Sequence, residues 1–202
     1  IDWEWAYGDQ SKFQYYYNED GQLQIDVTDK VGFGIKKFFE AQDGKATVEF
    51  DFMADRGDNA EITQNLLVLQ SNLSSLVKIN AIWNTDKYVF ETEDGGSGAS
   101  YATTKYQTTV ECTDNTSYRI KLVVDMETDT YDLYVKETSA AEYGDAIVQG
   151  RNLRINTKDA FDAFSIDMTN KSTEYTATFV YDNFVIQKVE EEATPTPTPT
   201  PS

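Results

Sequence analysis

Hydrophobic and polar residues alternate one by one over many short segments of the chain. Between Ala46 and Phe52 the apolar side chains occupy every second position, with Thr47, Glu49 and Asp51 between them. The same alternation recurs at 118–126, 131–135 and 164–168. Because successive side chains of a β-strand point to opposite faces, this pattern predicts strands with one buried face.

Shorter apolar runs, separated by turn-forming residues such as Glu19-Asp20-Gly21, predict more strands. These lie at 13–17, 23–27, 66–70, 76–83, 88–92 and 176–188. Gly32–Gly34 is expected to be a loop or bulge. Residues 138–150 are expected to form a long loop, with one helical turn at Ala140–Tyr143. About a dozen strands with few helical windows favour an all-β, two-sheet antiparallel sandwich.

All four prolines of the chain lie near its end, in an alternating Thr-Pro segment. Each proline fixes φ and removes a hydrogen-bond donor, so this segment stays extended and solvated. We therefore predict one domain at 1–189 and a Thr-Pro-rich interdomain linker at 190–202. Such spacers resemble those that join catalytic and binding modules in secreted bacterial polysaccharide-degrading enzymes. A catalytic module in the same polypeptide and an extracellular location are therefore expected.

Charge and composition exclude several classes of function. The formal net charge of −18 repels phosphate and argues against a nucleic-acid partner, whereas it suits calcium. No histidine is present, which excludes a Ser-His-Asp triad and a histidine-bound zinc site. Cys112 is the single cysteine, so no intrachain disulfide forms. No transmembrane run occurs, and we expect a monomer whose leader sequence has been removed.

Three segments together resemble the concanavalin A-like (laminin-G-like) jelly-roll family. They are Tyr118–Val135, a strand–turn–strand unit, Phe161–Ile166, and Phe179–Ile186 with its Asp-Asn pair. The chain departs from the family pattern after Val135, where Lys136-Glu137-Thr138 replaces a glycine turn, so a longer or rebuilt loop is expected. The resemblance implies a jelly-roll sandwich. That fold hosts glycoside hydrolases, polysaccharide lyases, lectins and carbohydrate-binding modules, so the site must decide the function.

The resemblance also implies a structural calcium ion. In such domains an ion often ties the N-terminal segment to the closing strand. The matching residues here are Asp2 or Glu4, together with Asp182. The loop Asp55–Glu61 also concentrates oxygen ligands, although its spacing does not match an EF-hand.

An enzymatic hypothesis centres on Glu49 and Asp51, which share one face of a strand. They resemble the start of the Glu-x-Asp motif of laminarinase-type glycoside hydrolases, in which a second glutamate follows. A retaining mechanism needs two carboxyl groups, one as nucleophile and one as acid. Met53 and Ala54 occupy the downstream positions, so the acid is missing. The alternative interpretation is an ordinary polar strand face.

A binding hypothesis rests on aromatic and basic side chains, because sugars stack on rings and bond to planar polar groups. Trp83 ends a predicted strand and precedes a polar turn, which would place it at an exposed rim. It also lies at every second position from the apolar residues of that strand, so burial in the core and stacking on a ligand are both possible interpretations. If their strands are neighbours, a polar shelf forms from these residues: Lys78, Asn80, Arg119, Lys121, Tyr134 and Lys136. Such a shelf suits an anionic polysaccharide such as pectin, whereas a neutral β-glycan would use Trp83, Asn80 and tyrosine stacking.

These observations favour a non-catalytic carbohydrate-binding module that tethers a secreted multimodular enzyme to plant cell-wall polysaccharide. Two alternatives are a polysaccharide-cleaving glycoside hydrolase or lyase of the same fold, and an adhesive surface domain that binds protein.

Overall fold

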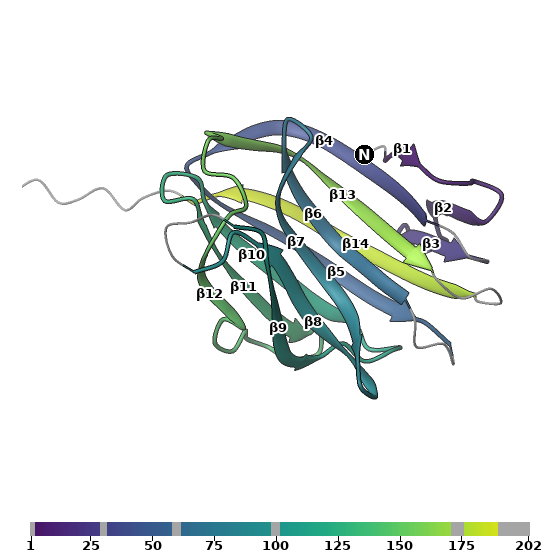
Figure 1. The fold of residues 1–202 in the computed structure, drawn as a ribbon. Coiled ribbons are helices and arrows are strands. Elements are labelled where there is room, and N and C mark those ends of the chain that lie inside the picture. The colour runs from purple at the N-terminus through teal and green to yellow at the C-terminus, as the bar shows by residue number, and fades with distance from the viewer. Residues whose placement is uncertain (1–2, 29–31, 58–61, 98–101, 171–175, 190–202) are drawn as a thin grey trace, which may run out of the picture.

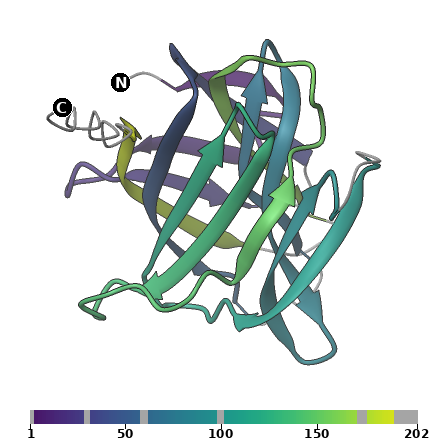
Figure 2. The same ribbon diagram turned by 90° about the vertical axis from the view of Figure 1, so that its left-hand side faces the viewer.

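The chain folds into two stacked layers of β-strands. The computed structural model describes residues 3–28, 32–57, 62–97, 102–170 and 176–189, and these ranges contain strands β1 to β14 and no helix (Figures 1 and 2). No helix among the described residues is therefore long and apolar enough to cross a membrane. The predicted linker, 190–202, lies outside the described residues.

Each layer is a seven-stranded sheet. Sheet A has the order β1 (Glu4–Tyr7), β4 (Gly32–Asp43), β13 (Ala160–Asn170), β6 (Ile62–Ser71), β7 (Ser74–Asn84), β8 (Lys87–Asp94) and β9 (Thr104–Glu111). Sheet B has the order β12 (Val148–Asn152), β11 (Thr130–Glu137), β10 (Tyr118–Asp125), β5 (Lys45–Asp55), β14 (Ala177–Lys188), β3 (Leu23–Val27) and β2 (Phe13–Tyr17). Every pair of neighbouring strands is antiparallel. The predicted all-β, two-sheet antiparallel sandwich is confirmed.

The core lies between the sheets and is rich in aromatic rings. Phe184 of β14 stacks on Phe50 and Phe164, with ring centroids 5.4 and 5.2 Å apart, and so joins a ring of sheet B to one of sheet A. Trp3 packs against Phe164 at 5.3 Å. Such rings bury large apolar areas and prefer offset or edge contacts, so these rings hold the two inner faces together. The polar residues that alternate with the core are left on the two outer faces.

A buried carboxylate joins the sheets at the side formed by β8, β9, β11 and β12. Asp94 of β8 is fully buried and accepts hydrogen bonds from Nε and Nη2 of Arg151, at 2.6 and 2.8 Å. The Tyr131 hydroxyl, the Thr104 hydroxyl and the Gly96 amide also donate to it. A buried charge is tolerated only when it is paired and hydrogen-bonded, as Asp94 is here.

Some local predictions were wrong. Gly32–Gly34 begins strand β4, and residues 138–147 contain turns and bends but no helical turn, so the expected turn at Ala140–Tyr143 does not form. Strand β12 starts within the segment expected to be a loop. Strand β9 gave no sequence signal, because most of its side chains are polar and exposed and only Thr108 is fully buried.

Candidate functional site

Two rows of residues cross the outer face of sheet A, because strand register places them opposite one another. The first row contains Tyr7, Gly34, Asp167, Asn65, Asn80, Glu91 and Gln107. The second contains Glu4, Lys36, Ser165, Val68, Lys78, Glu93 and Lys105. We call these two rows the sheet A ladder. It is polar at nearly every position, unlike the inner face of the same sheet.

The charged groups in the centre of the sheet A ladder are paired. Nζ of Lys78 and Nη1 of Arg154, in the loop after β12, each lie 3.1 Å from Oε1 of Glu93. The Asn80 amide nitrogen donates to Oε1 of Glu91 at 3.3 Å. Asn80 is only 3% exposed although it points to the outer face, and its carbonyl oxygen has no hydrogen-bond partner among the described residues. The centre of this face is therefore a preorganised polar surface.

Exposed aromatic rings lie at the β1–β4 end of the sheet A ladder. Tyr7 is 46% exposed, and its ring packs over β4 at Gly34, where an added Cβ would clash with Cε1 of the ring. Partial burial, with a contribution from the Asp167 carboxylate, raises the pKa of Tyr7 to about 12. Burial also raises the pKa of Asp167 itself, although a hydrogen bond from Ser165 opposes this. Phe38 is equally exposed, with Nζ of Lys36 5.3 Å from its ring centroid.

The outer face of sheet B carries a different cluster, in which Arg119 of β10 is held by two carboxylates of β5. Its Nε lies 3.3 Å from Oε2 of Glu49, and its Nη1 lies 3.2 Å from Oδ1 of Asp51. The amide of Asn183 donates to Asp51 at 2.7 Å, and the Tyr143 hydroxyl donates to Glu49 at 3.2 Å. Both carboxylates and the guanidinium are thus already committed to one another.

The loop that follows β11 folds back over this cluster. Nζ of Lys121 lies 4.4 Å from the ring centroid of Tyr134 and 4.3 Å from that of Tyr143, so it sits between two rings. Lys136 fixes the loop by donating to the carbonyl oxygens of Ala140 and Ala141. A cavity of about 350 Å³ remains, lined by Glu49, Asp51, Arg119, Lys136, Thr138 and Tyr143.

The predicted polar shelf does not form as one surface. Lys78 and Asn80 lie on the outer face of sheet A, whereas Arg119, Lys121, Tyr134 and Lys136 lie on the outer face of sheet B. The prediction that all these side chains point outward is correct. The alternation of residues along a strand, however, does not tell which sheet the strand joins. The two groups are separated by the thickness of the sandwich.

Trp83 lies at the end of the sandwich, in the hairpin that joins β7 and β8. It is 41% exposed and packs edge-on against Tyr88, with ring centroids 5.2 Å apart. Tyr88 is buried, and the Arg56 guanidinium lies 4.0 Å from its ring centroid. Trp83 is therefore a rim residue, braced from within, and it belongs to neither outer face.

Two of the expected calcium ligands, Glu4 and Asp182, are not brought together. Glu4 lies on the outer face of sheet A opposite Lys36, and Asp182 lies on the outer face of sheet B opposite Asp51. Asp2 and residues 58–61 lie outside the described residues. Within the described ranges, no group of three acidic, histidine or cysteine side chains could hold a metal ion. Glu4 and Asp182 therefore do not share one ion, and calcium binding through Asp2 or the 55–61 loop stays a prediction.

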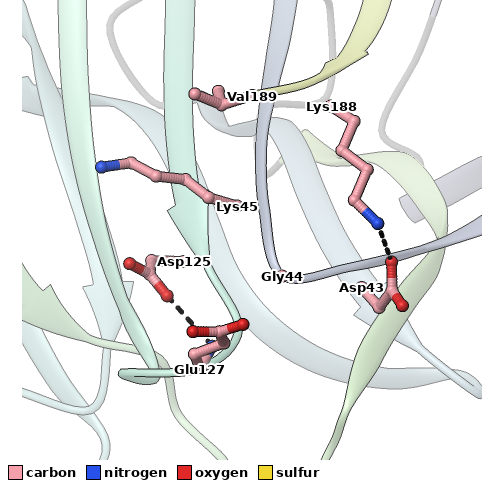
Figure 3. Close-up of a pocket in the computed structure, with 7 residues that line it drawn as sticks. All are labelled: Asp43, Gly44, Lys45, Asp125, Glu127, Lys188 and Val189. Atoms are coloured by element: carbon pink, nitrogen blue, oxygen red, sulfur yellow. Dashed lines mark hydrogen bonds and ion pairs between the residues drawn. The ribbon is translucent and has the colours of Figure 1, made fainter. Parts of the chain in front are cut away.

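A further pocket of about 280 Å³ lies where the β4–β5 turn, the β10–β11 turn and the end of β14 meet (Figure 3). It is lined by Asp43, Gly44, Lys45, Asp125, Glu127, Lys188 and Val189, and Lys188 pairs with Asp43 at 2.6 Å. No aromatic ring lines it, so it offers a sugar no stacking surface.

Tyr7 and Phe38 were not predicted as site residues from the sequence. Tyr7 lies in a four-residue strand too short to show a pattern. One signal was available: a glycine inside a strand often marks the close approach of another group, and Gly34 is approached by the Tyr7 ring.

Comparisons with known proteins bear on the fold. No protein-family model matches the chain, and no curated protein sequence matches it. Among solved structures, a sialidase superposes with a TM-score of 0.60 at 12% identity over 90% of this chain, which spans only 17% of that chain. An alginate lyase from Klebsiella pneumoniae gives 0.59 at 6% identity, covering 87% of this chain and 84% of that one.

A legume lectin-like domain from Entamoeba histolytica gives a TM-score of 0.58 at 9% identity, covering 90% of this chain and 92% of that one. Identities this low establish the fold alone, and the neighbours include both enzymes and a lectin-like domain. Together with the two antiparallel sheets, they show that the chain has the concanavalin A-like jelly-roll fold.

Proposed function

We propose that the protein is a non-catalytic carbohydrate-binding module whose ligand lies along the sheet A ladder. The observation that carries this proposal is the exposed Tyr7 ring, held against Gly34 at the end of a polar row that leads to Asn80 and Gln107. A ring beside fixed amides and charges matches what sugars require: a stacking surface for their C–H faces and planar groups for their hydroxyls. The lectin-like and sugar-cleaving neighbours share this fold and support a carbohydrate ligand.

Charge balance favours a neutral glycan over pectin. The sheet A ladder and Arg154 together contain four acidic and four basic side chains: Glu4, Glu91, Glu93 and Asp167, with Lys36, Lys78, Lys105 and Arg154. Lys78 and Arg154 are already paired with Glu93, so a uronate would have to displace an existing ion pair. On the opposite face, Arg119 is compensated in the same way. A neutral β-glycan would use Tyr7, Phe38 and the exposed amide of Gln107 without breaking these pairs.

A module of this kind would act by tethering. Residues 190–202 would link it to the catalytic module of a secreted enzyme. Binding to the polysaccharide would then hold the catalytic module at its substrate and raise its local concentration there. Affinity for each glycan would be modest, because an open, hydrated face gains little dry apolar area on binding.

Affinity electrophoresis through gels that contain β-glucan, xylan, galactan or pectin tests the proposal. We expect retardation by at least one neutral glycan and a clear loss of retardation in Tyr7→Ala. Lys121→Ala, on the opposite face, is the matched control and should migrate like the wild type. Equal retardation of Tyr7→Ala and wild type would show that the ligand does not bind at the sheet A ladder. Retardation by pectin alone that decreases with added salt would favour pectin as the ligand.

A polysaccharide-cleaving enzyme is the alternative, and one observation favours it. Asp167 has a raised pKa on the same face as Tyr7, and perturbed carboxyl groups are typical of catalytic sites. Glu49 and Asp51, the candidates from the sequence, are both bound to Arg119 and make a less suitable acid and nucleophile pair. Release of reducing ends or of unsaturated uronates by the purified chain, abolished in Asp167→Asn, would establish this alternative.

A further inference from the structure

Asp167 of β13 lies beside Tyr7 on the outer face of sheet A. Strand register places both residues opposite Gly34, with Tyr7 on one side of β4 and Asp167 on the other. A Cβ added at Gly34 would clash with the Tyr7 ring and with Oδ1 of Asp167, so the ring edge and the carboxylate are close neighbours. The glycine is what leaves room for both groups. A ligand that stacks on Tyr7 would therefore meet the partly exposed Asp167 carboxylate.

The Asp167 carboxylate has hydrogen-bonding capacity to spare. An ionised carboxylate can accept about four hydrogen bonds. Among the described residues, the Ser165 hydroxyl donates to Oδ2 of Asp167 at 3.4 Å, and the Asn65 side chain contributes a further hydrogen bond. The nearby cation Lys78 is paired with Glu93, at 3.1 Å. Acceptor positions on Asp167 therefore remain for hydroxyl groups of a ligand.

A carboxylate at this position opposes folding. Burial disfavours the charged form and raises the pKa of Asp167, although Ser165, Lys78 and Asn65 oppose this effect. The same carboxylate adds to the burial that raises the pKa of Tyr7 to about 12. An amide of equal size would avoid the cost of partly burying a charge. A perturbed carboxyl group that lies beside an exposed ring is typical of a functional site.

We propose that Asp167 determines which glycans bind at the sheet A ladder, because its carboxylate accepts hydrogen bonds from hydroxyls of a neutral sugar stacked on Tyr7 and repels uronates. This inference rests on the proposed function and deepens it. Two adjacent sugar hydroxyls can both donate to one carboxylate, and such charge-assisted bonds are about twice as strong as neutral ones. A uronate at the same position would bring two negative charges together. The ligand is therefore an uncharged polysaccharide with free hydroxyls on the stacked unit.

Isothermal titration calorimetry with a soluble neutral oligosaccharide, taken from whichever of β-glucan, xylan or galactan retards the chain, tests the inference. Asp167→Asn keeps the size of the side chain and should bind at least about tenfold more weakly than wild type at neutral pH. In pectin gels the same variant should be retarded more than wild type, because the repulsion is removed. Glu40→Gln removes an exposed charge elsewhere on β4 and is the matched control, with wild-type affinity expected.

The pH profile separates a carboxylate that binds ligand from one that only supports the fold. Hydroxyl groups bond more strongly to the ionised form, so wild-type affinity should fall as pH drops from neutrality towards the raised pKa of Asp167. Of the other groups on this face, Lys36, Lys78 and Tyr7 do not titrate in that range, whereas Glu93 does. Asp167→Asn keeps Glu93 and should lose much less affinity in acid, so the difference between the two profiles reports on Asp167.

The outcomes distinguish this inference from the proposed function. If no glycan binds the wild type, both fail. If Tyr7→Ala loses binding while Asp167→Asn matches the wild type in affinity and pH profile, the role of Asp167 is refuted and the proposed function stands. Tighter binding to cationic chitosan than to every neutral glycan would also refute it, since the carboxylate would then pair with an ammonium group.

A stability measurement tests whether Asp167 is merely structural. Urea denaturation should show Asp167→Asn to be at least as stable as wild type, because the amide avoids the cost of burying charge. A clearly less stable variant would assign Asp167 a structural role and contradict the inference.

Discussion

Replacing Asp94 by asparagine tests the physical basis of the fold most severely. Asp94 is fully buried and accepts bonds from Arg151, Tyr131, Thr104 and the Gly96 amide, so it links β8 of sheet A to β11 and β12 of sheet B. Asparagine keeps the size but leaves the Arg151 guanidinium, itself largely buried, without a counter-charge. Breaking such a pair by removing one partner costs about 3–5 kcal/mol.

The expected loss is large compared with the whole stability of a domain, which is typically about 5–15 kcal/mol. Urea denaturation followed by tryptophan fluorescence should show the free energy of unfolding of Asp94→Asn lowered by about 3–5 kcal/mol. Thr104→Val, which removes one neutral donor, should cost about 0.5–1.5 kcal/mol and keeps the test informative if Asp94→Asn does not fold. Asp43→Asn breaks an exposed pair with Lys188 and should leave the midpoint unchanged. A loss below about 1 kcal/mol for Asp94→Asn would refute the reasoning.

The same network predicts a pH dependence. Burial on its own raises the pKa of Asp94, but hydrogen bonds from Arg151, Tyr131, Gly96 and Thr104 outweigh it and hold the pKa below its ordinary value. A carboxylate with a lowered folded-state pKa contributes stability that is present above its unfolded pKa, about 3.9, and is lost as pH falls through the folded value. Wild type should therefore lose stability below about pH 4 more steeply than Asp94→Asn. Parallel stability curves in acid would contradict this account.

Three further predictions concern single residues. Tyr7, whose pKa is raised to about 12, should not contribute to the tyrosinate absorbance that develops near pH 10, and its contribution to stability should fall as pH rises between these values; a Tyr7→Phe titration curve that loses amplitude near pH 10 would refute this. Phe50→Ala should lower the free energy of unfolding by about 3–5 kcal/mol in urea denaturation, because Phe50 is buried. Phe38→Ala should leave the free energy of unfolding nearly unchanged and weaken retention by glycan gels, because Phe38 is exposed. Equal losses of stability in the two variants would contradict the assigned burial. Gly34→Ala should displace the Tyr7 ring and weaken retention in affinity gels, and undiminished retention would exclude Tyr7 as the platform.

The fold was largely predictable, because alternating apolar and polar residues indicate a strand that is buried on one face. Segments such as 46–52 and 118–125 have apolar inner and polar outer faces, and both became strands of sheet B. Strand β9 lacks this contrast, and β4 begins with glycines that suggested a loop. A strand pattern shows only what burial demands, so a strand that is polar on both faces leaves no trace in it.

The site was less predictable, because neighbours in a sheet are not neighbours in sequence. Outward parity was right for Lys78 and Arg119, but these residues lie on opposite faces of the sandwich. The carboxylates that neutralise Arg119 lie on β5, some 70 residues away along the chain. Tyr7 gains its exposed position only because β1 pairs with β4 at Gly34. Strand order and register, which determine these contacts, are set by tertiary packing and turn geometry rather than by local pattern.

One experiment addresses the central claim directly: incubation of the purified chain with each retarding glycan, with binding and product release measured on the same sample. The account predicts saturable binding that Tyr7→Ala weakens, with no new reducing ends and no unsaturated uronates at any time point. Steady accumulation of either product, abolished by Asp167→Asn or by replacement of Glu49 and Asp51, would contradict it.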